Sequence, residues 1–181
     1  MRRLILGLFF LLAVAPAQAT EAGWALLRNG GHVVLLRNAM TTGTVEPPNF
    51  DIGKCATQLN LSDRGRQQAR RIGALFAARA APVERVLSSR YCRALETARL
   101  AFGDRLVEPF EALDAREDAA PESDAAILER IRAFSGSDNL VLVTHGETIR
   151  RLTGATAREG EAIVVAPADD RLHILGRIVF N

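Results

Sequence analysis

The chain has 181 residues, with 23 Lys or Arg against 21 Asp or Glu. This length is enough for one domain of ordinary size with a proper hydrophobic core. The near-balanced charge, without any basic tract interleaved with aromatic residues, argues against a nucleic-acid partner.

The N-terminus has the pattern of a secretory signal peptide. Two arginines precede an almost unbroken apolar run over residues 4–14, and a small-x-small cleavage site follows at residues 17–19. The run is shorter than the ~20 residues that span a bilayer, so an uncleaved membrane anchor is the weaker alternative. We therefore expect an exported bacterial protein, periplasmic or secreted. Residues 1–19 would be the signal, and residues 20–181 a single domain without a stable membrane span.

Helices and strands are predicted to alternate along the rest of the chain. Apolar residues at spacings of three and four indicate helices, and compact apolar runs indicate strands. Helices are expected over residues 22–29, from Ser62 to the residue before Pro82, and over residues 91–102, 124–134 and 147–152. Strands are expected over residues 32–36, 85–88, 106–108, 139–144, 162–165 and 172–180. This alternation predicts an α/β fold, a three-layer α/β/α sandwich with a mainly parallel central sheet.

Two segments show neither the apolar spacing of a helix nor the apolar run of a strand. Residues 38–60 are rich in Gly, Pro and Thr, and a loop of this length inside a compact domain is usually functional. Residues 109–123 are acidic and are predicted to be irregular. His32 and His173 fall within predicted strands, and we interpret them as ordinary strand residues.

The sequence contains two cysteines, Cys55 and Cys92. In an exported protein an even pair suggests a disulfide, which would connect the long loop to the turn that carries Arg93. Two reduced, buried thiols are the alternative. The spacing fits no zinc or CxxC motif.

Polar residues of one chemical kind follow three predicted strands. Arg37 and Asn38 follow the first, Arg93 lies in the first turn of the helix after the second, and His145 follows the strand at 139–144. The carboxyl ends of parallel strands meet at one edge of a sheet, where ligands bind. Two guanidiniums, an imidazole and a helix N-terminus there would favour phosphate or another oxyanion.

Four segments, in order over residues 31–154, resemble motifs of the histidine phosphatase superfamily, whose fold is phosphoglycerate mutase-like. They are LLRNA at 35–39, NLSDRG at 60–65 with QA at 68–69, SSRYCRA at 88–94 with TA at 97–98, and VTHG at 143–146. Gly30-Gly31-His32 and CATQ at 55–58 resemble the short, exported branch of that family.

The resemblance implies roles for four residues. In the family a first histidine attacks the phosphoryl group, while arginines and a second histidine hold its oxygens. By position, Arg37, Arg93 and His145 match the phosphate pocket, and Asn38 occupies the place of the nucleophilic histidine. A carboxamide nitrogen has no available lone pair near neutral pH, so Asn38 is not expected to form a covalent intermediate.

Two other positions are left open by the resemblance. Glu108, Glu111, Asp114 and Glu117 lie in the region of the acid that protonates the leaving oxygen, and no motif chooses among them. Leu59 stands where the exported branch often has arginine, so a substrate-side cation is missing there. No metal or organic cofactor is implied.

Four hypotheses for function follow. The chain is a natural pseudoenzyme that binds a phosphorylated ligand or a partner protein. Alternatively, it is an active phosphomonoester hydrolase of the cell envelope with residual or rerouted activity, for example by direct attack of water. Third, Asn38 is an engineered or accidental change in a normal phosphatase; fourth, the chain is an α/β binding protein of another family. The expected ligand is a phosphate-bearing small molecule or an envelope component, such as a sugar or lipopolysaccharide phosphate.

Overall fold

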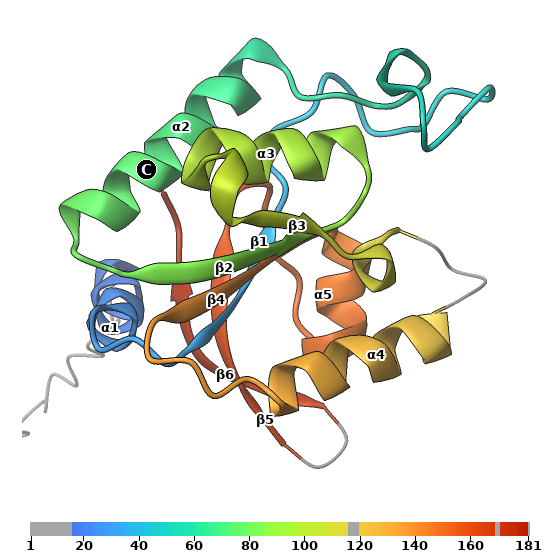
Figure 1. Ribbon diagram of the computed structural model, residues 1–181. Helices are drawn as coiled ribbons and strands as arrows, with labels where there is room; N and C mark the ends of the chain where they lie inside the picture. The colour runs from blue at the N-terminus through green and yellow to red at the C-terminus, as the bar shows by residue number, and fades with distance from the viewer. Residues whose placement is uncertain (1–15, 116–119, 169–170, 181) are drawn as a thin grey trace, which may run out of the picture.

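Within the part of the chain that the structure describes, six strands form one sheet (Figure 1). The computed structural model describes residues 16–115, 120–168 and 171–180. The strands are β1 (Val33–Arg37), β2 (Val83–Ser88), β3 (Val107–Pro109), β4 (Asn139–Thr144), β5 (Ala162–Pro167) and β6 (Leu172–Ile178). Their order is β3-β2-β4-β1-β5-β6. The first four in this order are parallel, whereas β5 and β6 are antiparallel to their neighbours.

Helices cover both faces of the sheet (Figure 1). They are α1 (Pro16–Arg28), α2 (Asp63–Ala78), α3 (Cys92–Phe102), α4 (Ala120–Arg132) and α5 (Gly146–Thr153), with the 3-10 turns η1 (Cys55–Thr57), η2 (Asp104–Leu106) and η3 (Glu111–Leu113). Side chains of α1, α2 and α3 pack against alternate residues of β1 and β4, and α4 and α5 pack against the intervening residues. Because successive strand residues point to opposite faces, one apolar run contributes to both cores.

The predicted α/β class and three-layer arrangement are confirmed, with an antiparallel pair of strands at one edge. Two boundaries differ from the prediction by four residues or more. Helix α1 begins at Pro16 rather than at residue 22, so the predicted cleavage point after Ala19 lies inside it. Residues 120–123, predicted to be irregular, begin α4, because a proline is tolerated in the first turn of a helix. Residues 1–15, which hold most of the predicted signal, lie outside the described residues.

The pairing of β1 with β4 aligns two polar strand ends. The register places Arg37 beside Thr144, so Asn38 and His145 leave the sheet at the same edge. The backbone N–H of Asn38 extends the pairing by donating to the carbonyl of Thr144 at 2.9 Å. The parallel sheet therefore brings together residues that lie more than a hundred positions apart in the sequence.

A disulfide joins the loop after β1 to the start of α3. Cys55 and Cys92 are bonded with their Cα atoms 5.6 Å apart, which confirms the predicted pairing. Gln58 adds polar contacts at the same place. Its Oε1 accepts from the N–H of Cys92 at 2.9 Å, and its Nε2 donates to the carbonyls of Asp51 and Ile52 at 3.0 and 2.9 Å. The loop is thus held against the helix that carries Arg93.

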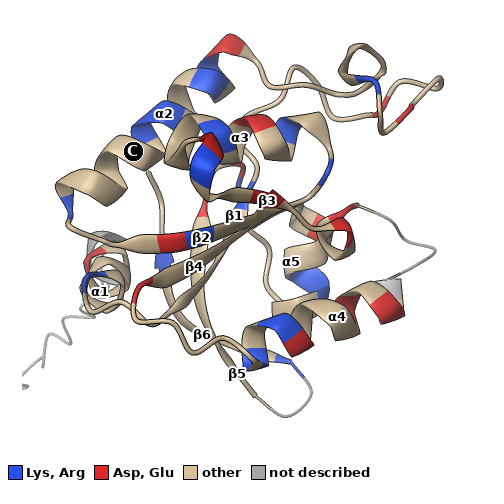
Figure 2. Ribbon diagram, viewed as in Figure 1, with Lys and Arg blue, Asp and Glu red and all other residues tan. Residues whose placement is uncertain are grey.

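Charged residues of both signs belong mainly to the helices and connecting segments (Figure 2). His32 lies just before β1, and His173 lies within β6. Among the described helices, none combines the length and the apolar character that crossing a membrane requires.

Candidate anion-binding site

A cleft of about 350 Å³ opens at the carboxyl ends of β1 and β4. Four of the residues that line it, Arg37, Asn38, Arg93 and His145, are those that the sequence pattern singled out. The other lining residues are Thr41, Gly43, Thr44, Leu59, Ala115, Gly146, Glu147 and Glu159. The convergence expected from the strand ends is therefore present.

Arg37 is held from two sides. Its Nη1 donates to the carbonyl of Ala157 at 2.8 Å. Its guanidinium lies so close to Gly146 that a Cβ at that position would be 3.1 Å from Nη1. The buried Nε of Arg37 has no hydrogen-bond partner among the described residues. An anion in the cleft would meet the positive charge of Arg37 and an Nε–H group that can donate a hydrogen bond to it.

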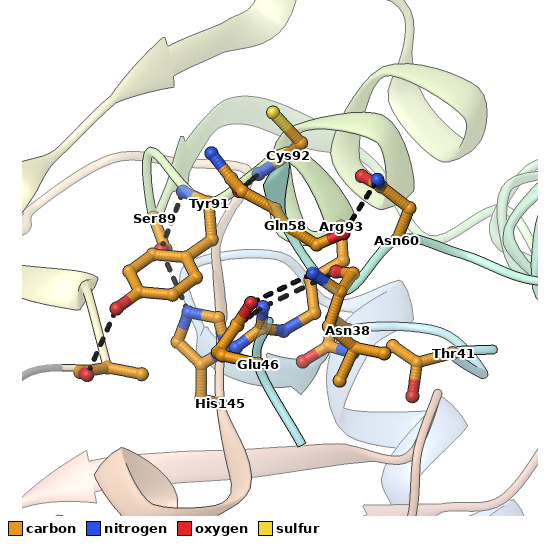
Figure 3. A network of polar contacts seen from close by, with 12 residues as sticks. Asn38, Thr41, Glu46, Gln58, Asn60, Ser89, Tyr91, Cys92, Arg93 and His145 are labelled. Atoms are coloured by element: carbon orange, nitrogen blue, oxygen red, sulfur yellow. Dashed lines mark hydrogen bonds and ion pairs between the residues drawn. The ribbon is translucent and has the colours of Figure 1, made fainter. Parts of the chain in front are cut away.

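Arg93 extends from the first turn of α3 into the cleft and is 8% exposed. Its guanidinium lies over the ring of Tyr91, with Cζ 4.6 Å from the ring centroid. Its Nη1 forms an ion pair with the carboxylate of Glu46, as Figure 3 shows. The stacking and the ion pair fix the guanidinium, and the ion pair depends on the loop after β1 staying close to α3.

His145 is anchored through one ring nitrogen. Its Nε2 lies 2.9 Å from Oγ of Ser89 (Figure 3). The hydroxyl of Ser89 in turn donates to Oδ1 of Asp114 at 2.9 Å. Asp114 is 2% exposed and is bound by Arg90, with Nη2 and Oδ2 2.7 Å apart. Since the single hydroxyl proton of Ser89 points to Asp114, Nε2 of His145 must carry a proton. The neutral imidazole therefore has its lone pair on Nδ1.

The electrostatic surroundings keep His145 neutral. Burial lowers its pKa well below the ordinary value of 6.5, and the positive charges of Arg93 and Arg37 lower it further. The Nδ1 atom is buried and has no hydrogen-bond partner within the described part of the chain. A bound anion would offset the two arginines and favour the protonated ring.

Asn38 is 4% exposed and is constrained by its backbone. Its carbonyl accepts from the N–H of Gly160 at 3.0 Å, and its own Nδ2 donates to the carbonyl of Ala39 at 3.0 Å. The side chain can offer an amide donor to a ligand but not a basic nitrogen.

Motif residues outside the cleft hold the segment after Asn38. Oγ1 of Thr97 accepts from the N–H of Ala39, and Oε1 of Gln68 accepts from the N–H of Met40, both at 3.0 Å. Ser62 caps α2, as predicted, by accepting from the N–H of Gly65 at 3.0 Å. The threonine and glutamine of the sequence motifs thus act on the backbone beside the site.

The acids considered for proton donation have other partners. Glu108 pairs with Arg85 at 3.3 Å and Glu111 with Arg90 at 2.9 Å, and neither lines the cleft. The buried Asp114 does not line it either. Glu117 lies outside the described residues. Local sequence position suggested these acids, but distant arginines decide what they contact.

Two other acids were not identified from the sequence. Oε1 of Glu46 contacts Arg93, and its Oε2 accepts from the N–H of Leu59 at 2.8 Å. Oε1 of Glu159 accepts from Oγ1 of Thr41 at 2.7 Å and from its N–H at 3.2 Å. Both acids belong to irregular segments, where no periodicity or motif indicates direction.

The fold and its strand-end cleft define a phosphoglycerate mutase-like α/β protein. The model of the histidine phosphatase superfamily (branch 1) matches residues 33–119. That segment includes Arg37, Asn38 and Arg93, whereas His145 lies beyond it. No curated protein shows significant similarity to the sequence.

Solved structures share the fold at low identity. A structure from Agrobacterium tumefaciens, named as a proposed phosphohistidine phosphatase SixA, is 20% identical, with a TM-score of 0.58 over 82% of this chain and 97% of that one. The protein histidine phosphatase SixA complexed with tungstate is 16% identical, with a TM-score of 0.58 over 81% and 96%.

A phosphoserine phosphatase from Entamoeba histolytica, a histidine-to-alanine mutant in complex with phosphoserine, is 14% identical. Its TM-score is 0.56 over 81% of this chain and 95% of that one. The family model thus matches a segment that carries three of the four cleft residues, and these solved structures share the fold of the chain.

Proposed function

We propose that this chain is an exported member of the superfamily that binds phosphomonoesters in the described cleft and turns them over very slowly or not at all. The observation that carries the proposal is the placement of Arg37, Arg93 and His145 around Asn38 in one cleft. Three groups suited to phosphoryl oxygens surround a side chain that cannot accept the phosphoryl group.

Binding is supported by the charge and donor pattern of the cleft. Two guanidiniums provide geometry that matches phosphoryl oxygens, and Nε of Arg37 is buried without a protein partner in the described residues. The oxyanion tungstate is bound by one structural neighbour. A mutant neighbour that lacks a histidine is in complex with phosphoserine. A protein of this fold can therefore bind a phosphorylated ligand after one of its histidines has been replaced.

Impaired turnover is supported by the chemistry of Asn38. Covalent catalysis needs a nitrogen lone pair at working pH, and the amide lone pair is delocalised into the carbonyl. In a triad hydrolase, loss of the nucleophile lowers kcat on the order of 10⁶-fold, while the binding groups retain residual catalysis. We expect the same separation of binding from covalent chemistry here.

Export is part of the proposal. The N-terminal pattern indicates a signal over residues 1–19, which leaves residues 20–181 as one mature domain. The Cys55–Cys92 disulfide suits an oxidising compartment such as the periplasm. Phosphate-bearing envelope components are then accessible ligands.

An active hydrolase that uses water directly is a second candidate. Glu147 and Glu159 line the same cleft as Asn38, and a carboxylate there could orient an attacking water. This route needs no phosphohistidine, so it predicts a turnover rate that does not change when the residue at position 38 is replaced.

A side-by-side assay separates the two candidates. Phosphate release from p-nitrophenyl phosphate is measured for the protein, for Asn38→His and for Arg93→Ala, together with vanadate affinity. We expect the protein to bind vanadate without measurable turnover, Asn38→His to gain turnover and an acid-labile phosphohistidine, and Arg93→Ala to lose vanadate binding. Equal turnover by the protein and Asn38→His would replace the proposal with direct water attack. Absence of vanadate binding by the protein would overturn the binding function.

A further inference from the structure

The anion position at Arg93 is already occupied by a side chain of this protein. Both carboxylate oxygens of Glu46 are engaged, one with Arg93 and one with the N–H of Leu59. The side chains of Arg93 and Glu46 are 10% and 29% exposed. Figure 3 shows the carboxylate of Glu46 against the guanidinium of Arg93. A phosphoryl group that approaches Arg93 therefore meets a carboxylate on the same guanidinium.

A purely anionic ligand would leave this carboxylate poorly paired. Taking Arg93 from Glu46 leaves a partly buried negative charge without its cation, which is unfavourable. Neither of the two acids that line the cleft, Glu147 and Glu159, compensates for this charge. Glu147 pairs with Arg150 at 2.7 Å, and Glu159 is itself a carboxylate held by Thr41.

A positive charge on the ligand would give Glu46 a new partner when Arg93 binds the phosphoryl group. Arg93 would pass from Glu46 to the phosphoryl group, while Glu46 would pass from Arg93 to the positive charge of the ligand. Two ion pairs replace one, and no carboxylate is left alone. Leu59 lines the cleft and carries no charge, so a ligand cation meets no like charge from that side chain.

This inference rests on the proposed function. We propose that Glu46 is the specificity-determining residue of the cleft, and that the cleft selects phosphomonoesters carrying a positive charge close to the phosphoryl group, as aminoalkyl phosphates do. The phosphoryl group contacts Arg37 and Arg93, and the ammonium group contacts the carboxylate of Glu46.

The test compares two ligands that differ in one charged group. Affinities for O-phosphoethanolamine and ethyl phosphate are measured by calorimetry at pH 7 for the disulfide-bonded protein, for Glu46→Gln and for Glu96→Gln. Glu96 is a matched control, because it lies on α3, forms an ion pair with Arg66 of α2 at 2.8 Å and makes no ion pair with Arg93 among the described residues.

We expect the protein to prefer O-phosphoethanolamine by about fivefold or more, the value of an ion pair near 1 kcal/mol. In Glu46→Gln this ratio should fall to near one, with ethyl phosphate binding tighter than to the parent. Glu96→Gln should keep the parent ratio.

A parent ratio near one, or an unchanged ratio in Glu46→Gln, would overturn this inference while leaving the proposed function intact. Failure of the parent to bind either ligand would instead overturn the proposed function, and this inference with it. The parent ratio alone already tests the inference if Glu46→Gln does not fold.

Discussion

At the scale of single residues, His145 couples the site to pH. Its pKa is lowered in the folded protein, so the unfolded chain takes up a proton below pH 6.5 that the folded chain does not. The stability contributed by the neutral ring is complete above this pH and is lost as the pH falls, by at most about 1.4 kcal/mol per pH unit.

We therefore predict that the free energy of unfolding falls less steeply between pH 7 and pH 5 in His145→Gln than in the parent. Glutamine retains an N–H that can donate to Ser89, so the contact with Nε2 of His145 is imitated without a titrating group. Urea unfolding at several pH values gives the two slopes. Parallel slopes would show that His145 does not titrate differently in the two states.

The ring of His145 should take up a proton when an anion binds in the cleft. Burial lowers the pKa of His145, and the charges of Arg93 and Arg37 lower it further; a bound phosphate offsets these two charges, so the pKa should rise and the ring should take up protons on binding. Calorimetry of phosphate binding in two buffers with different ionisation enthalpies measures this uptake. The parent should take up more protons than His145→Gln, and equal uptake would contradict the assignment.

A substitution at Gly146 tests whether phosphate binding depends on the position of the Arg37 guanidinium. A methyl group there would lie 3.1 Å from Nη1 and 3.2 Å from Cζ of Arg37, so the guanidinium must shift. We expect Gly146→Ala to weaken phosphate binding by about threefold or more, because charge-assisted contacts depend on geometry. Thermal unfolding should be little changed, since alanine is the better helix former. Gly53→Ala, in the loop outside the cleft, should leave affinity unchanged; equal affinities of the two variants would contradict the prediction.

At the scale of elements, the disulfide fixes the loop after β1 against α3. The bond joins cysteines separated by 37 residues. Replacing both Cys55 and Cys92 by alanine should lower the free energy of unfolding by about 4 kcal/mol in the chain-entropy model. Urea unfolding measures the change, and a reductant should destabilise the parent but not the double variant. Equal stability of the two proteins would show that the loop is held by its other contacts.

Those other contacts explain why the sequence motifs extend beyond the cleft. Thr97 and Gln68 accept hydrogen bonds from the backbone that follows Asn38, and Gln58 accepts one from the start of α3. Each of these side chains connects two elements that are distant in sequence. The motifs therefore specify the path of the backbone around the site as well as the groups inside it.

At the scale of the whole molecule, the sheet order determines which residues can meet. Strand β4 lies between β2 and β1, so the ends of β1 and β4 and the start of α3 after β2 reach one edge. Helices cover both faces of the sheet (Figure 1), and the cleft lined by the polar groups opens at that edge. The antiparallel β5 and β6 extend the sheet on the far side of β1 and return the chain along it.

The sequence by itself determined those features that depend on nearby residues. Compact apolar runs indicated β1 and β4, Ser62 indicated the start of α2, and a single cysteine pair indicated the disulfide. Strand-end position identified Arg37 and His145, because parallel strands bring their carboxyl ends to one edge whatever the loops do.

Only the tertiary structure decided which charged groups pair. Glu46 lies in a segment without periodicity, and its contact with Arg93, 47 residues away, depends on a loop path set by long-range bonds. Glu108 and Glu111 were candidates by position, yet each is paired with an arginine outside the cleft. A charge interacts through space over several ångströms, so its partner follows from the fold and not from its place along the chain.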